Sequence, residues 1–444
     1  MSAAVAALLL LALPARSQPA APEPPPAAAL VGFHDYVGRA LDASPEVGQA
    51  EAGAAQAEAQ WKSQTAAAWL PTLSFTGTGY PYGHNPANSY QFTTWRLNRS
   101  DMSFNTTVDF NLFNSFGDAL RVKSARLGRD ATRQALFASR QDRAIVAAQA
   151  YLDLSLRERL LEVAREYLKA QEDQYRLTKD LYEHGMKSLA DLLKSETDRR
   201  SSELLLVSAQ ADRRRALVQF NALIDRSPEE EARVEAQAAP TAELKPLAQD
   251  LEAAEVNRPE LRRARALLDQ ADVATSQAVR DALPNFSVDF TWNHQDTANF
   301  GQPVTALTGF PNPNYQLGLR LALPSGFNFV SQGENWLAAK QARRAAAQGR
   351  RALVRQVRTE AVDARISLEQ ALASARLASE KAEIALKNLE LVTEQYKQGS
   401  ADVIRLAQAQ LDYLQARTER SQADHDAGLS LLSYRRAIGE RLWP

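Results

Sequence analysis

The feature that most constrains the fold is an internal duplication. The stretch from Tyr182 to Ile224 aligns without a gap with the C-terminal stretch from Tyr396 to Ile438, so that the two differ by one constant offset in residue number. Identity within the block is low, but the same offset also places Pro45-Glu46 on Pro259-Glu260. An offset that recurs at distant points of the chain indicates one unit present twice rather than two unrelated domains. Further matches are Gly185 with Gly399, Leu192 with Leu406, Phe220 with Tyr434, and Ala147, Ala150 and Leu154 with Ala361, Ala364 and Leu368.

The composition excludes several classes of protein. Lys plus Arg (52) nearly equals Asp plus Glu (53), so the chain has no overall basic character that would favour nucleic acid. The absence of cysteine excludes a disulfide framework, a thiolate metal site and a cysteine nucleophile. The five histidines are scattered without metal-ligand spacing, and no P-loop, GxGxxG or GxSxG motif is present. We therefore predict no catalytic residue, cofactor or metal, and a protein that is not an enzyme.

The first residues have the pattern of a targeting segment. An apolar run of about ten residues from Ala3 to Leu13 precedes small residues, as in a secretory signal, and is too short to span a bilayer as a helix. A disordered leader is the alternative interpretation. Residues 18–29 are a Pro/Ala-rich tether. No later stretch has 18 consecutive apolar residues, so a membrane-spanning part would have to be a β-barrel.

The placement of proline predicts where long helices lie. Residues 87–227 and 325–443 contain no proline, the strongest helix breaker. In the first of these gaps a helix from Gly117 to Gly185 would span about 100 Å, and the chain then returns as a second helix. The second gap repeats this arrangement, with an expected interruption at Gly349 and a turn at Gly399. The heptad seams of the two hairpins are Leu154, Leu161, Leu168, Tyr175 and Tyr182, and Leu368, Ala375, Ala382, Leu389 and Tyr396.

Four segments alternate polar and apolar residues with the period of a strand. Their length of about 9 to 11 residues matches strands that span a bilayer. A soluble sheet with one buried face has the same alternation, but the adjoining helices are polar and offer it no cover. Four strands cannot close a barrel, and open edges are not tolerated in lipid, so several chains must share one barrel. Two chains would give eight strands, and three would give twelve with room for a lumen.

The apolar faces of these strands are predicted to face lipid. The lipid-facing residues are Phe104, Val108, Phe110, Leu112, Phe286, Val288, Phe290, Trp292, Leu317, Leu319 and Leu321. Trp69, Trp95 and Trp292 lie near strand ends, where tryptophan can anchor a protein at a membrane interface, although ordinary packing is an equal alternative.

The order, spacing and duplication of these motifs resemble the TolC-type outer membrane efflux protein family from about Leu30 to Trp443. The motifs are the PEV and PEL helix starts, the Leu-Pro strand entries and the Tyr-x-x-Gly turns at 182–185 and 396–399. The resemblance implies a mainly α fold with a small β part. It implies a duplicated unit of long antiparallel coiled-coil hairpins, plus four β-strands that contribute to a trimeric 12-stranded outer membrane β-barrel and a periplasmic α-barrel.

The resemblance also implies function and partners. A homotrimer would form a channel-tunnel in the outer membrane of a Gram-negative bacterium, with a long periplasmic extension. It would be the exit duct of a tripartite efflux pump or a type I secretion system. Its partners would be outer membrane lipid, a periplasmic adaptor (membrane fusion protein) and an inner-membrane pump of the RND, ABC or MFS type. The alternative is a soluble periplasmic coiled-coil scaffold or adaptor, but a scaffold does not explain the strands and an adaptor would have one hairpin.

The predicted division of the chain follows the duplication. The segments are a signal peptide (1–17), the tether (18–29), repeat 1 (30–225, with strands at about 72–80 and 102–112 and a helical hairpin at 118–225), an equatorial connector (226–258), repeat 2 (259–439, with strands at about 285–293 and 315–323 and a hairpin at 332–439) and a tail (440–444).

In the family, the glycine turns lie at the periplasmic tip, where the tube narrows and the adaptor docks. Some members have acidic residues six and nine positions after the second glycine, but here these positions hold Arg405 and Gln408. The (i, i+3) spacing of Asp402 and Arg405 suggests instead a contact, within one chain or between chains, that helps hold the tip closed. The resemblance selects Tyr182, Gly185, Ser188, Asp191, Leu192, Tyr396, Gly399, Asp402, Val403, Arg405 and Leu406 for docking and gating.

Overall fold

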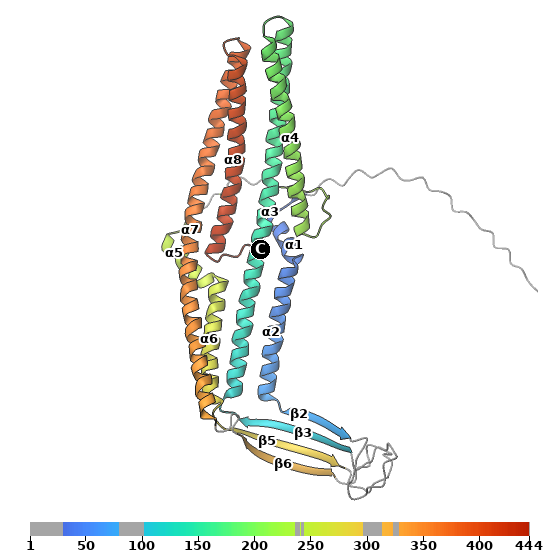
Figure 1. The fold of residues 1–444 in the computed structure, drawn as a ribbon, viewed down its shortest axis with the longest axis vertical. Helices are drawn as coiled ribbons and strands as arrows, with labels where there is room; N and C mark the ends of the chain where they lie inside the picture. Colours follow the sequence, from blue (N-terminus) through green and yellow to red (C-terminus); the bar gives the residue numbers. More distant parts are fainter. Residues whose placement is uncertain are drawn as a thin grey trace, which may run out of the picture.

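The chain folds into a long wall of helices with a four-stranded sheet at one end (Figure 1). A computed structural model describes residues 30–79, 102–235, 240, 244–295, 313–322 and 328–443. The predicted signal peptide, the tether and Trp95 lie outside the described residues. Within the part that is described, no helix is both long enough and apolar enough to cross a membrane.

Two helices run the full length of the wall. They are α3 (Gly117–Glu183, 67 residues) and α7 (Phe329–Lys397, 69 residues). Helix α7 continues through Gly349, so the predicted interruption there is wrong; one glycine inside a long, packed helix costs too little to end it. The helices beside them are α2 (Pro45–Trp69), α4 (Leu189–Leu223), α6 (Pro259–Arg280) and α8 (Val403–Ala437). Their order across the wall is α4–α3–α8–α7 in the half that bears the hairpin tips and α2–α3–α6–α7 in the half that bears the sheet (Figure 1).

A belt of short elements surrounds the middle of the wall. It contains α1 (Phe33–Asp42), α5 (Leu247–Asn257) and the parallel two-residue strands β1 (Leu30–Val31) and β4 (Arg233–Val234). The largest apolar core lies here, where the fully buried ring of Tyr36 stacks on that of Phe220, with 4.0 Å between ring centroids.

The sheet is fully antiparallel, in the order β2-β3-β5-β6. Its strands are β2 (Thr72–Gly79), β3 (Met102–Phe113), β5 (Asn285–Gln295) and β6 (Pro313–Ala322). The register sets apolar residues in rows, one of which is Leu73, Val108, Phe290 and Leu317. Neighbouring rows are polar, as in Thr72, Asp109, Asp289 and Gly318.

A β-bulge in β3 changes one predicted position. The register shifts between Asn111 and Phe113, so that Phe113 pairs with Phe286 and Leu112 is the extra residue. A bulge places two residues opposite one and reverses the alternation beyond it. Phe113, rather than the predicted Leu112, therefore lies on the apolar face at the end of β3.

The duplication is visible in the backbone. Gly185 and Gly399 have φ of 74° and 75°. Asp225 and Gly439, which correspond at the same offset, have φ of 55° and 78°. Corresponding helices begin and end alike because corresponding turns use a residue in the same left-handed conformation.

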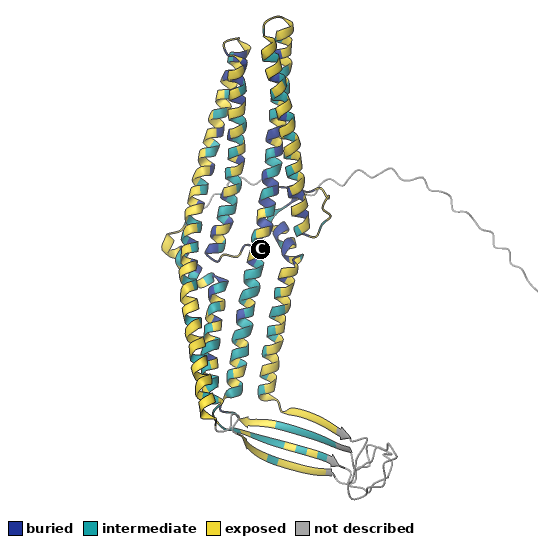
Figure 2. Ribbon diagram, in the orientation of Figure 1, coloured by how far each residue is buried: buried dark blue, intermediate teal, exposed yellow. Residues whose placement is uncertain are grey.

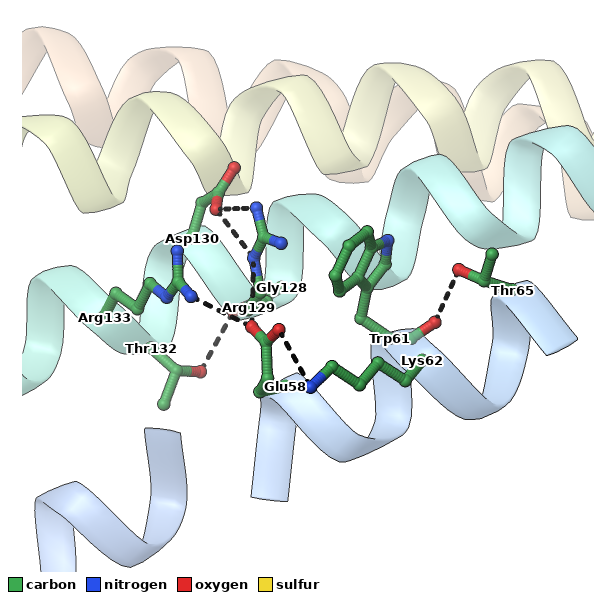
Figure 3. Close-up of polar contacts among 9 residues, drawn as sticks. All are labelled: Glu58, Trp61, Lys62, Thr65, Gly128, Arg129, Asp130, Thr132 and Arg133. Atoms are coloured by element: carbon green, nitrogen blue, oxygen red, sulfur yellow. Dashed lines mark hydrogen bonds and ion pairs between the residues drawn. The ribbon is translucent and has the colours of Figure 1, made fainter. Parts of the chain in front are cut away.

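The duplication extends to an ion pair between neighbouring helices. In the first repeat Glu58 of α2 lies 3.8 Å from Arg129 and 3.0 Å from Arg133 of α3, and the Arg129 guanidinium lies 4.4 Å from the centroid of the Trp61 ring (Figure 3). At the positions equivalent to Glu58 and Arg129, the second repeat pairs Asp272 of α6 with Arg343 of α7. The pair fixes the same helix against its long neighbour in both units.

Candidate functional site

The two hairpin tips have the same backbone. The N–H of Gly185 donates to the carbonyl of Tyr182 (2.8 Å), and that of Gly399 donates to the carbonyl of Tyr396 (3.0 Å). The next residues, Met186 and Ser400, donate back to carbonyls five residues earlier. This is the glycine C-cap that ends a helix with a residue in the left-handed conformation. The Tyr-x-x-Gly motif is thus a turn, which exposes a narrow tip.

Each return helix begins with a side-chain cap. Ser188 and Asp191 form a capping box, in which the Ser188 hydroxyl accepts from the Asp191 amide (3.2 Å) and the Asp191 carboxylate accepts from the Ser188 amide (3.1 Å). At the equivalent position, the Asp402 carboxylate accepts from the backbone N–H of Arg405 (2.8 Å).

The predicted contact between the side chains of Asp402 and Arg405 is therefore wrong within the chain. A residue at the N-cap aligns its carboxylate with the amide three residues later, so Asp402 is directed to the backbone. Among the described residues the Arg405 guanidinium, which is exposed, forms no ion pair. Gln408 donates to Asp412 (2.7 Å).

The other predicted tip residues divide by burial. Tyr396, Val403 and Leu406 pack together in a small core at the second tip. At the first tip Leu192 is half-buried, and Tyr182 is 38% exposed, against 3% for Tyr396. The two tyrosines are equivalent in the repeat but have different surroundings.

Tyr396 connects the second tip to the first hairpin. Its hydroxyl lies 3.3 Å from Thr178 Oγ1 of α3, and Gln174 donates to the same Thr178 hydroxyl (3.1 Å). The ammonium of Lys187, in the first tip turn, lies 4.8 Å from the centroid of the Tyr396 ring. Both contacts hold the tip of the second hairpin against the first hairpin.

A row of polar contacts continues from Tyr396 toward the middle of the wall, and we call it the polar seam. It consists of Thr178–Tyr396, Gln171–Gln410 (2.9 Å), Glu166–Arg417 and Arg159–Asp424 (3.1 Å). Burial raises the pKa of the Asp424 carboxyl, although Arg159 acts in the opposite direction. Of these residues the sequence selected only Tyr396; the signal for the others was polar side chains at inward-facing helical positions of α3.

Apolar residues form a row along each outer edge of the wall in the half that bears the tips. On α7, Leu377, Ile384 and Leu391 each follow an inward-facing residue of the heptad seam by two positions, which is about 200° around the helix. Figure 2 shows exposed residues along α7 and α4. The edge residues are Ile366, Leu377, Ile384 and Leu391 on α7, and Leu193, Leu204, Val207 and Val218 on α4.

Among the described residues, nothing covers the apolar face of the sheet. Apart from Leu112, the predicted lipid-facing residues lie on this face, in register across the strands. Leu73 and Phe75 of β2 lie on the same face and were not predicted, because the strand carries glycine at its next alternate positions. Leu319 is 84% exposed. No group of three or more potential metal ligands occurs among the residues that the structure describes.

Comparisons with known proteins agree with this geometry. The sequence profile of the outer membrane efflux protein family matches residues 36–225 and 251–440, one match for each repeat. A comparison with curated protein sequences gives no match.

Solved structures of outer membrane channels have a similar fold. The VceC protein of Vibrio cholerae is 17% identical, with 92% of this chain and 96% of that one covered and a TM-score of 0.73. The CmeC channel of Campylobacter jejuni is 16% identical, with 92% and 85% covered and a TM-score of 0.74. The MtrE channel of Neisseria gonorrhoeae is 18% identical, with 93% and 89% covered and a TM-score of 0.72.

These likenesses extend over both repeats, and the family profile matches most of the chain. The chain therefore belongs to the outer membrane efflux protein family.

Proposed function

We propose that this efflux channel is a homotrimer that spans the outer membrane of a Gram-negative bacterium and extends through the periplasm. It is the exit duct of a tripartite efflux pump or a type I secretion system. A periplasmic adaptor docks at the hairpin tips and connects the duct to an inner-membrane pump.

The match between the two edges of the wall is the observation that carries the proposal. On α4, the exposed residues Leu193, Val207 and Val218 lie 8, 22 and 33 residues after the tip glycine Gly185. On α7, the same three separations, counted back from Gly399, lead to Leu391, Leu377 and Ile366, which are also exposed. With a rise of about 1.5 Å per residue, each pair lies at one height, at about 12, 33 and 50 Å from the tips. The α4 edge of one copy therefore fits the α7 edge of the next.

A contact between two different edges generates a ring when the rotation closes. The sheet is compatible with the same assembly, because β2 and β6 run in opposite directions and β6 of one copy can pair antiparallel with β2 of the next. Each copy adds four strands. Three copies give a closed barrel of twelve, with the polar rows inside and the apolar rows toward lipid.

The tips support docking by a helical partner. Met186 and Leu189 at the first tip, and Ile404 at the second, are exposed apolar residues beside the caps of Ser188 and Asp402. A long adaptor hairpin can place apolar residues against such positions. A soluble scaffold is disfavoured because it would leave the apolar face of the sheet in water.

Disulfide cross-linking tests the ring, since the chain has no cysteine of its own. Val207→Cys with Leu377→Cys places both thiols at one height, so oxidation of outer membrane fractions should give covalent dimers and trimers and nothing larger. Val207→Cys with Ile366→Cys separates the thiols by about three helical turns along the wall and is the matched control. A monomer in the soluble fraction, or a ladder beyond three, would refute the trimer. Cross-linking in intact cells, followed by purification, should recover an adaptor, and its loss on Met186→Asp would place docking at the tip.

A further inference from the structure

Large apolar side chains are exposed at all four junctions between the long helices and the strands. The α2–β2 junction has Trp69 and Leu70, the β3–α3 junction has Phe116, the α6–β5 junction has Leu283, and the start of α7 has Phe329 and Val330. We call these six residues the junction collar. The ends of α2, α3, α6 and α7 that bear them lie where the helical wall meets the sheet (Figure 1).

The β3–α3 junction has an unusual backbone. Ser115 and Phe116 both adopt the left-handed conformation, with φ of 56° and 64°. Two consecutive non-glycine residues in this region, one of them aromatic, are strained and persist only where the surroundings hold them. As a result, the Phe116 side chain is 62% exposed, although it adjoins the buried Ser115.

Contacts to the neighbouring junction hold this turn. The Ser115 hydroxyl donates to the carbonyl of Pro284 (3.2 Å), and Arg280 Nη1 donates to the carbonyl of Ser115 (2.7 Å). The Arg280 guanidinium carbon lies 5.3 Å from the centroid of the Phe116 ring. Among the described residues, the other guanidinium N–H groups of Arg280 have no acceptor.

The collar continues the apolar face of the sheet. The Phe113 ring, at the end of the apolar row, meets the Phe116 ring edge-on, with 5.6 Å between centroids. Beyond Phe116 the chain enters α3, whose surface is polar. An aromatic ring beside a cation, at the end of an apolar surface, is the chemistry that suits the boundary between hydrocarbon and headgroups.

We infer that the junction collar lies at the lipid boundary on the helical side of the membrane, where the strained turn directs Phe116 into the interface and Arg280 holds a lipid phosphate. This inference rests on the proposed insertion of the sheet into a membrane. A guanidinium with unused donors binds a phosphate with charge-assisted hydrogen bonds, and the Phe116 ring covers one side of it.

Site-directed spin labelling measures the depth of the turn. In the full chain, reconstituted into vesicles of phosphatidylethanolamine and phosphatidylglycerol, single cysteines replace Phe116, Leu319 or Gln341 and are labelled with a nitroxide. Leu319 is the lipid reference. Gln341, an exposed residue of α7 that lies roughly three helical turns beyond Phe329, is the aqueous reference. We expect the label at 116 to be accessible to oxygen and shielded from a water-soluble nickel complex, at a depth shallower than that of 319.

Each outcome has one meaning. If the label at 319 reports water, the proposed membrane insertion fails. If 319 reports lipid and 116 is as accessible to nickel as 341, the collar inference fails alone. If the label at 116 is shielded from oxygen as well as from the nickel complex, a protein contact covers it in place of lipid, which also overturns the inference.

The role of Arg280 has a separate readout that does not depend on the label. Arg280→Gln should reduce the phosphatidylglycerol that copurifies with the protein at least twofold. Arg344→Gln, which changes an exposed arginine of α7 whose only described partner is Gln341, should leave it unchanged. Equal amounts of copurified phosphatidylglycerol in the two variants would show that Arg280 holds no lipid phosphate.

Discussion

At the level of single residues, the two hairpin tips differ most at one tyrosine. Tyr182 and Tyr396 occupy the same position in the duplicated motif and make the same backbone hydrogen bond. Only Tyr396 is buried, between Thr178 and Lys187 of the other hairpin. The Tyr396 side chain, rather than an acidic group near the turn, therefore holds the second tip in place.

Tyr396→Phe should loosen the second tip without unfolding the wall. The variant keeps the ring under Lys187 and loses the contact with Thr178, which costs about 1 kcal/mol of local stability. Hydrogen exchange of the segment 392–406 should accelerate roughly fivefold. Tyr182→Phe is the control, because no described residue bonds the Tyr182 hydroxyl. Equal exchange in the two variants would show that the Thr178 contact contributes nothing.

Gly185→Ala and Gly399→Ala should each destabilise a tip by about 1 kcal/mol, since an L side chain is disfavoured in the left-handed conformation. A Cβ at either position meets no atom within 4 Å, so backbone strain is the whole effect. Gly349→Ala, in the helical interior of α7 and also free of contacts, should stabilise by about 0.5–1 kcal/mol. Thermal unfolding and local hydrogen exchange measure the loss of stability at Gly185 and Gly399 and the gain at Gly349. Destabilisation by Gly349→Ala would show that this position is not an ordinary helical one.

At the level of elements, the wall has two kinds of seam. Inside the second hairpin, buried small and apolar residues of α7 line the seam with α8, as Leu368, Ala375 and Ala382 do. Between the hairpins, α3 meets α8 and the end of α7 through the polar seam. Polar contacts exchange with water at a smaller net cost than apolar ones, so we expect the two hairpins to separate from each other more readily than the second hairpin opens.

The polar seam should respond to pH through Asp424. Burial raises the pKa of this carboxyl above its ordinary value of 3.8, so the packed seam binds the proton more tightly than the open one. Its contribution to stability is therefore complete at low pH and is lost as the pH rises through the raised pKa. Hydrogen exchange of the segment 416–430, corrected for intrinsic exchange, should accelerate as the pH rises above that ordinary value.

Asp424→Asn should flatten this profile. Glu419→Gln is the opposite control and should steepen the profile. The hydrogen bond from Lys381 lowers the pKa of the Glu419 carboxyl, so the contribution of Glu419 to stability is lost as the pH falls. An unchanged slope in Asp424→Asn would exclude this carboxyl as the titrating group.

In the sheet, Asp109 and Asp289 lie directly opposite each other on β3 and β5. Like charges in such a pair are unfavourable, so Asp289→Asn should stabilise the sheet by about 0.2–1 kcal/mol. Asparagine keeps the shape of aspartate beside Gly318, where any Cβ would lie 2.7 Å from the Asp289 carboxylate. The unfolding midpoint in detergent measures the gain, and Thr107→Ser in a neutral row is the control. A lower midpoint would show that the carboxylate has a favourable partner in the assembly.

At the level of the whole molecule, the residues that the structure describes leave two edges unpartnered and one face uncovered. The apolar rows of α4 and α7, and the free edges of β2 and β6, are at opposite sides of the same protomer. A single copy therefore buries only part of its apolar surface. In the proposed trimer, stability and assembly are linked, because the contacts of the ring and the lipid would cover the remaining apolar surface.

A charge exchange across the edge tests this link. Val207→Glu or Leu377→Lys alone should prevent the trimer, because each places a charge in an apolar contact. The two together bring opposite charges to one height and should restore part of the assembly, read as the trimer fraction on native gels. Leu204→Glu with Leu377→Lys, whose heights differ by nearly one helical turn, should be rescued less well. Assembly of both single variants would show that this row is not the interface.

Much of the fold follows from local patterns. The duplication, the two hairpins, the four strands and the positions of the tip turns come from periodicity, proline placement and single glycines, which act within a few residues. The capping at Ser188 is likewise local, since a serine followed by an acid three residues later is a capping box.

What only the tertiary structure decided concerns pairs of elements far apart in the chain. The bulge at Leu112 depends on how β3 pairs with β5, and the burial of Tyr396 depends on how one hairpin packs against the other. The sequence presents Tyr182 and Tyr396 as equals because the motif around them is the same. They differ because Thr178 and Lys187 of the first hairpin contact Tyr396, whereas Tyr182 stays 38% exposed. A neighbour supplied by another part of the chain leaves no mark on the local pattern.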